Sequence, residues 1–135
     1  MTTEIFHESK GKLQYSKDWR LVLKVDQDLA DYYRSLIPPW MSSQRPRWPA
    51  HITVVRQEKE MPVNKQHWWK HNNRTVSFIY SPIIHHDSVY YWINVWCKIL
   101  EEIRIELGMP FHSPFTLPPA GFKKNSHCTI ANTKE

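Results

Sequence analysis

His51-Ile52-Thr53-Val54 recurs as His127-Cys128-Thr129-Ile130, and this repeated stretch decides the fold that we expect for the chain. Residues two apart in an extended strand project from the same face. Each copy therefore places an imidazole beside a threonine hydroxyl, while the apolar residues that alternate with them face a core. Two such strands side by side would present two histidines and two threonines to one pocket: His51, Thr53, His127 and Thr129.

The His-x-Ser/Thr spacing also occurs at His7 and His86, where an acidic residue stands in the middle and a solvated turn is the expected structure. The copies at 51 and 127 differ, because they use threonine and have apolar residues at both alternate positions. The alternative is that one or both of these histidines are ordinary strand residues, satisfied by hydrogen bonds to their neighbours. We favour the paired site.

Length and composition indicate one globular domain over residues 1–135. Hydrophobic residues make up 41% of the chain and there are only three glycines, so the chain can form a core. The net charge of +5 is scattered along the chain. Such a charge attracts phosphates, but it is too small and diffuse to favour binding of duplex DNA.

The sequence predicts a cytoplasmic protein with no membrane partner. It contains no run of 18 apolar residues, and its first residues form neither a basic start nor an apolar stretch typical of a signal peptide. Cys97 and Cys128 fall at the start of an expected helix and inside an expected strand. We therefore interpret them as buried free thiols in a reducing compartment.

Hydrophobic periodicity predicts a mixed α+β chain. Each half places a helix before a motif strand, which indicates a two-lobed, duplicated architecture. Residues 40–49 and 109–124 are expected to be loops, and the segment around Trp68 a short helix and loop. The expected strands cover 19–25, 74–80, 89–95 and 126–132 besides the first motif, and the expected helices cover 26–37 and 96–107.

The two His-x-Thr strands in a small α+β chain resemble the two-histidine (2H) phosphoesterase superfamily. The resemblance extends from Trp19 to Asn132. It implies two similar lobes of antiparallel sheet with outer helices, and motifs that line a central cleft. Members of this superfamily include cyclic phosphodiesterases and enzymes that process RNA ends.

A narrower likeness is to the phage anti-CBASS nucleases, which degrade the cyclic oligonucleotides that bacteria use as antiviral signals. Only Thr133-Lys134-Glu135 follow the second motif, so a ligand-covering segment that those nucleases have there has no counterpart. This departure leaves ligand choice open. The likeness rests on four blocks: Pro49–Arg56, Arg74–Pro82, Ile103–Gly108 and His127–Asn132.

The motif residues suit acid–base cleavage of a phosphodiester, and the resemblance implies a 3′–5′ bond in a cyclic di- or trinucleotide. One imidazole would take a proton from the attacking group and the other would protonate the leaving oxygen. Thr53 and Thr129 would bind phosphate oxygens. The sequence leaves open which of His51 and His127 is the base.

Further ligand contacts are expected from residues outside the motifs. Tyr15, Trp68 and Trp69 are candidates for base stacking or a hydroxyl contact, and core or rim packing is the alternative for each. Arg56 is a candidate for phosphate binding, with ordinary solvation as the alternative.

We expect no metal and no cofactor, because the sequence has no H-E-x-x-H, no C-x-x-C and no carboxylate triplet beside either motif. The adjacent pair His85-His86 is expected on a surface turn. Two other functions stay open: a 2′,3′-cyclic phosphodiesterase or RNA-end processing enzyme, and a nucleotide-binding module without catalysis.

Overall fold

The fold is built mainly from strands whose residues alternate between buried and exposed positions. A computed structural model describes residues 6–110 and 126–133 of the chain. In the strand over residues 75–80, Val76 and Phe78 are buried, whereas Thr75 and Ser77 are exposed. The described strands are β1 (His7–Tyr15), β2 (Leu21–Val25), β3 (His51–Val55), β4 (Thr75–Tyr80), β5 (His85–His86), β6 (Tyr90–Trp96) and β7 (Ser126–Asn132).

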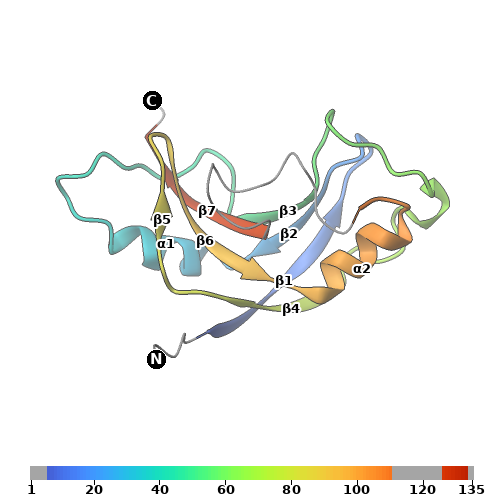
Figure 1. Cartoon of the computed structure of the whole chain (residues 1–135), viewed down its shortest axis with the longest axis horizontal. Helices are drawn as coiled ribbons and strands as arrows, with labels where there is room; N and C mark the ends of the chain where they lie inside the picture. The colour runs from blue at the N-terminus through green and yellow to red at the C-terminus, as the bar shows by residue number, and fades with distance from the viewer. Residues whose placement is uncertain (1–5, 111–125, 134–135) are drawn as a thin grey trace.

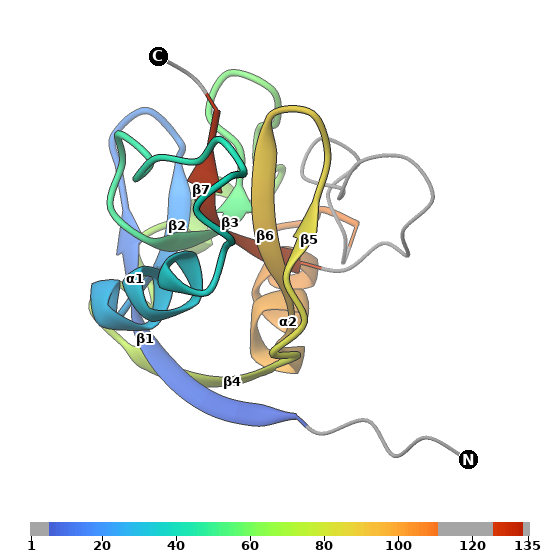
Figure 2. The same cartoon turned by 90° about the vertical axis from the view of Figure 1, so that its left-hand side faces the viewer.

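These strands form an antiparallel sheet that closes on itself (Figures 1 and 2). Among the described residues the strand order is β4-β1-β2-β3-β7-β6-β5. β4 also pairs with β6, through Ile79 with Trp96 and Tyr80 with Val95, so six strands close into a barrel. β5 lies outside this ring and pairs with β6. The two motif strands, β3 and β7, are neighbours in the barrel.

Side chains from the barrel strands meet in one hydrophobic cluster inside the barrel. Leu13, Leu23, Ile52 and Ile130 have no exposed surface and belong to this cluster. Burying one such aliphatic side chain fully contributes about 1.5–3 kcal/mol to folding. Because Ile52 and Ile130 belong to the motif strands, the core holds both motifs in place.

The first helix, α1 (Gln27–Ser35), begins where the sequence supplies a cap. The carboxylate of Asp26 accepts a hydrogen bond from the backbone N–H of Asp28 at 3.0 Å. This satisfies one of the backbone donors that a helix start leaves unpaired. Ala30 and Tyr33 are the buried residues of the helix and join the core cluster.

The second helix, α2 (Lys98–Glu106), buries Leu100 and Ile103 and ends before Gly108. Gly108 has a φ of +78°, a conformation that glycine adopts without steric cost. A Cβ at Gly108 would lie 2.8 Å from the Cβ of Val63, so the position also requires the absence of a side chain. Figure 1 shows α1 and α2 toward opposite ends of the long axis of the molecule.

The α+β class predicted from the sequence is confirmed, and both helices lie within their predicted ranges. The 3-10 helix η1 (Lys65–His67) comes just before Trp68. The predicted loop over 109–124 lies almost entirely outside the described residues. None of the described helices is long and apolar enough to cross a membrane.

Two sequence predictions are wrong. His7-Glu8-Ser9 is not a turn but the beginning of β1, which pairs with β4 from His7 to Lys12. The pair His85-His86 is not a turn but the short strand β5, paired with Trp92 and Tyr91. Both segments are polar, so they lack the hydrophobic alternation that marks a strand, and their partners impose the extended conformation.

Candidate functional site

The two motifs meet at the centre of the sheet, between β3 and β7. Ile52 pairs with Cys128 in antiparallel register, and both side chains are buried in the core. Continuing this register by one residue in each direction sets His51 across from Thr129 and Thr53 across from His127. All four side chains project from the face opposite to the core, and all four are half-buried.

This arrangement brings the two imidazoles close together. Residues directly across an antiparallel pair lie about 4.5–5.5 Å apart at Cβ, and diagonal neighbours lie roughly 7–8 Å apart. His51 and His127 are diagonal neighbours in this register. A gap of that size suits a phosphate group with one imidazole on each side, and each threonine hydroxyl stands next to an imidazole of the other strand.

His51 is held in one tautomer by the backbone. Its Nδ1 lies 2.7 Å from the carbonyl oxygen of Pro49. Because a carbonyl oxygen can only accept, Nδ1 must carry the hydrogen, and in the neutral ring Nε2 then carries the lone pair. Neutral His51 therefore offers its proton-accepting nitrogen on the side away from Pro49.

The surroundings of His51 also favour its neutral form. Burial lowers the pKa of His51 below its ordinary value of 6.5, and the positive charge of Arg20 lowers it further, while the hydrogen bond to Pro49 opposes both. A histidine with a lowered pKa is unprotonated at neutral pH and can accept a proton. Sequence reasoning did not single out Arg20, which precedes β2.

His127 lies among residues of β6. Asn94 pairs with His127 and Trp92 pairs with Thr129, so both residues of β6 share the face of the motifs. The rings of Trp92 and His127 meet edge to face with their centroids 6.4 Å apart. Trp92 is only 1% exposed, so it forms a fixed wall beside His127.

Asn94 is a candidate that sequence reasoning missed. The indole Nε1–H of Trp92 donates to Oδ1 of Asn94 at 3.2 Å. Because an indole nitrogen can only donate, this bond fixes which end of the amide is oxygen and directs the Nδ2 donors to the other side. The sequence alone offers no signal for Asn94, because only the register of β6 with β7 sets it across from His127.

A buried ion pair between Arg104 and Glu60 contacts the backbone of the motif strand β3. Arg104 of α2 is 3% exposed, and its guanidinium donates to the carbonyl oxygen of Val54 at 2.8 Å. The same guanidinium lies 2.9 Å from the carboxylate of Glu60. Val54 directly follows Thr53, so Arg104 fixes the backbone beside a motif hydroxyl. A charged residue inside the apolar stripe of a predicted helix was the signal for this interaction.

The structure does not bring Tyr15 and Trp68 to the face of the motifs. Both side chains are in the core cluster, with ring centroids 4.9 Å apart in an edge-to-face contact. Burial raises the pKa of Tyr15 to about 12. Trp68 donates from its indole nitrogen to the carbonyl oxygen of Ser16. For these two residues the structure shows the packing alternative, and the ligand-binding prediction is corrected accordingly.

The other two predicted ligand residues are accessible. Trp69 is 47% exposed and has a φ of +75°, and its ring centroid lies 6.2 Å from that of Tyr15. Arg56 is exposed directly after β3, three residues beyond Thr53. Within residues 6–110 and 126–133 there is no group of three or more His, Cys, Asp or Glu side chains that could hold a metal ion.

Comparison with known proteins identifies no relative of this chain. No protein family matches it, and no curated protein or solved structure matches it significantly. The function must therefore be inferred from the residues of the site.

Proposed function

We propose that this protein is a metal-independent phosphodiesterase that cleaves 3′–5′ bonds in cyclic di- or oligonucleotides. The observation that carries the proposal is the pairing of Ile52 with Cys128, which aligns two His-x-Thr strands on one face of the sheet. Binding a nucleotide does not require two imidazoles. Acid–base catalysis needs two proton-transfer groups, one that accepts a proton and one that donates one, and a pair of imidazoles supplies both.

In the proposed reaction, His51 is the base and His127 the acid. Nε2 of His51 takes the proton from a ribose 2′-OH, and the 2′-oxygen forms a bond to phosphorus. The bond from phosphorus to the 5′-oxygen breaks, and His127 protonates that oxygen. Cleavage of one bond opens the ring and leaves a 2′,3′-cyclic phosphate at one end of the chain and a 5′-hydroxyl at the other. Each proton transfer contributes about 10²–10⁴-fold to the rate.

The hydroxyls of Thr53 and Thr129 and the amide of Asn94 act as donors to the non-bridging phosphate oxygens. They stand on neighbouring strands of the same face, two of them directly across from His127. Donors fixed by a sheet cost little reorganisation when negative charge develops in the transition state. The assignment of His51 as base rests on its hydrogen bond to Pro49 and its lowered pKa.

The order of elements supports a two-lobed 2H phosphoesterase arrangement. β1, β2, α1 and β3 form one strand–strand–helix–strand unit, and β4, β6, α2 and β7 repeat that order with β5 inserted. Each unit ends in a motif strand, and the two motif strands pair with each other. A duplicated unit of this kind accounts for the repeat of the motif and for its position at the centre of the sheet.

The test is a substrate panel incubated with the protein in the presence of EDTA: cyclic di- and trinucleotides, 2′,3′-cyclic nucleotides and short RNA. We expect cleavage of the cyclic di- or trinucleotides and no effect of the chelator. Cleavage confined to 2′,3′-cyclic nucleotides or RNA ends would assign the alternative enzyme, and binding without cleavage would assign a binding module. An enzyme inactivated by EDTA and restored by a divalent ion would refute the metal-independent mechanism.

A further inference from the structure

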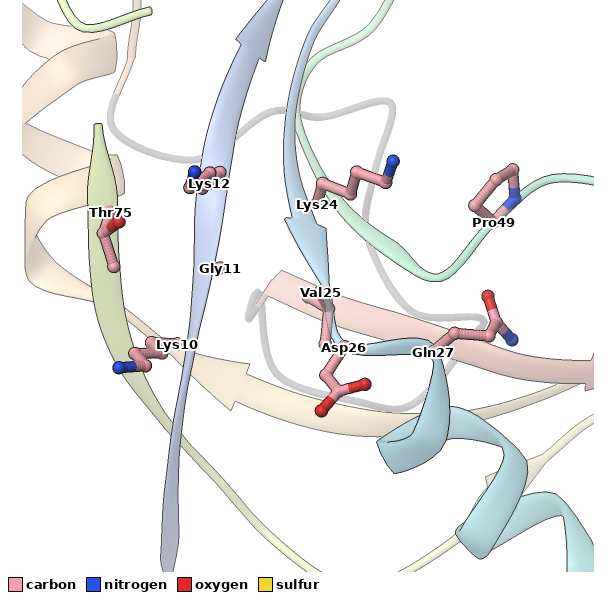
Figure 3. Close-up of a pocket in the computed structure, with 9 residues that line it drawn as sticks. All are labelled: Lys10, Gly11, Lys12, Lys24, Val25, Asp26, Gln27, Pro49 and Thr75. Atoms are coloured by element: carbon pink, nitrogen blue, oxygen red, sulfur yellow. The ribbon is translucent and has the colours of Figure 1, made fainter. Parts of the chain in front are cut away.

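A hollow lined by lysines adjoins the motif face. It has a volume of about 520 Å³, and Figure 3 shows Lys12 and Lys24 on the adjacent strands β1 and β2, with Thr75 on one side and Pro49 on the other. Lys10 also lines it. Pro49 provides the carbonyl that holds His51, so this hollow begins at the backbone of the candidate site.

The sheet register connects the hollow to the catalytic residues in one row. Thr75 pairs with Lys12, Lys12 with Lys24, and Lys24 with His51. Directly paired residues of an antiparallel sheet share a face. Since adjacent strands are about 4.8 Å apart, Lys12 stands roughly 10 Å from His51 along this row. A single small ligand could therefore contact both the lysines of the hollow and His51.

The charge of the hollow is positive. Lys10, Lys12 and Lys24 are exposed, and the acidic residue of the lining, Asp26, uses an oxygen of its carboxylate to cap α1. A lysine is a compact positive charge on a flexible stem, which suits a phosphate approached from solvent. This row of paired residues leads from His51, in the proposed catalytic site, to lysines whose positive charge suits a second phosphate group.

We propose that this hollow binds a second phosphodiester group of the same substrate while His51 and His127 act on the first. This inference rests on the proposed function and restricts the class of substrate that the protein prefers. The preferred substrates carry at least two phosphates in one compact molecule, as cyclic dinucleotides do. A linear dinucleoside monophosphate has a single 3′–5′ phosphodiester, which the motifs would hold, and gains nothing from the lysines.

The kinetic test compares Lys12→Gln/Lys24→Gln with the wild type on both substrate classes. For a cyclic dinucleotide we expect KM to rise by about 100-fold, roughly tenfold for each ammonium group removed, with kcat retained. For a linear dinucleoside monophosphate, which carries a single 3′–5′ phosphodiester, we expect no change in KM. Lys12→Arg/Lys24→Arg should restore most of the affinity, and Lys98→Gln on α2 is the matched surface control. An equal rise in KM for both substrate classes would overturn the proposal.

A binding measurement separates this inference from the proposed function. Calorimetry with a cyclic dinucleotide that lacks both 2′-hydroxyls reports affinity without cleavage. Affinity that depends on Lys12 and Lys24 in a protein that cleaves no nucleotide would sustain the phosphate site and refute the enzyme. Cleavage of cyclic dinucleotides with an affinity indifferent to both lysines would sustain the enzyme and refute the phosphate site. Failure of the wild type to bind this ligand would likewise refute the phosphate site.

Discussion

At the scale of single residues, the proposed chemistry depends on two histidines with different surroundings. His51 is fixed by the carbonyl of Pro49, whereas His127 lies against the edge of Trp92. Unequal surroundings are what an acid–base pair requires, since the two groups must start the reaction in opposite protonation states. The sequence shows two equivalent motifs, and only the structure shows that their surroundings differ.

The paired role predicts that His51→Ala and His127→Ala each reduce kcat by at least 100-fold, because each removes one proton transfer. Both variants should keep the circular dichroism and thermal transition of the folded protein. His86→Ala is the matched control, since His86 is an exposed histidine that pairs with Tyr91 on β6 and not with Trp92. A rate above about a tenth of wild type in either motif variant would exclude the pair.

The lowered pKa of His51 predicts the shape of the pH profile. The base must be unprotonated, so the acid limb of the kcat/KM profile should fall as pH drops through the pKa of His51. Because burial lowers this pKa below 6.5, the midpoint of the acid limb should lie below 6.5. Rates measured from pH 4.5 to 8 on a cyclic dinucleotide would locate it. A midpoint above 6.5 would argue against His51 as the base.

At the scale of elements, the helix α2 supports the motif strand through Arg104. Arg104→Met would leave the carboxylate of Glu60 buried and unpaired, which typically costs about 3–5 kcal/mol. Urea denaturation should show this decrease in stability. Arg34→Met, which breaks the more exposed pair with Asp31 on α1, should cost no more than about 1 kcal/mol.

The double variant Arg104→Met/Glu60→Met tests the reason for that decrease. Removing both charges leaves no unpaired ion, so the stability should be largely recovered. A double variant that is as unstable as Arg104→Met would show that the hydrogen bonds of Arg104 to the carbonyls of Val54 and Pro110, and not the charge of Glu60, dominate. Similar small decreases for Arg104→Met and Arg34→Met would contradict the account of a buried ion pair.

Elements with their own hydrophobic period could be predicted from the sequence. α1 and α2 have apolar stripes and end signals, β4 alternates clearly, and β6 is rich in aromatic and β-branched residues. β5 and the polar first residues of β1 could not be predicted, because their extended form comes from pairing with β6 and β4. The same limit applies to the site. The motifs were visible in the sequence, but Asn94 and Lys24 became candidates only through the register that sets them across from His127 and His51.

At the scale of the whole molecule, closure of the barrel fixes the distance between the motifs. β3 and β7 are far apart in the sequence, and their pairing depends on β2 on one side and β6 on the other. The pairing of β4 with β6 then joins the two halves a second time. A ring of this kind presents the proposed catalytic side chains from rigid strands, so the site should bind its substrate with little rearrangement.

A rigid site leads to a prediction about the nucleophile. Replacing both riboses of a cyclic dinucleotide with 2′-deoxyribose removes the attacking hydroxyl but keeps the bases, both charges and most of the shape. The molecule should therefore bind with an affinity close to that of the parent and resist cleavage. Product analysis by chromatography after incubation with excess enzyme would check this, with the parent ribonucleotide as control. Rapid cleavage of the deoxy substrate would mean that water attacks phosphorus directly, and His51 would then activate water in place of the sugar.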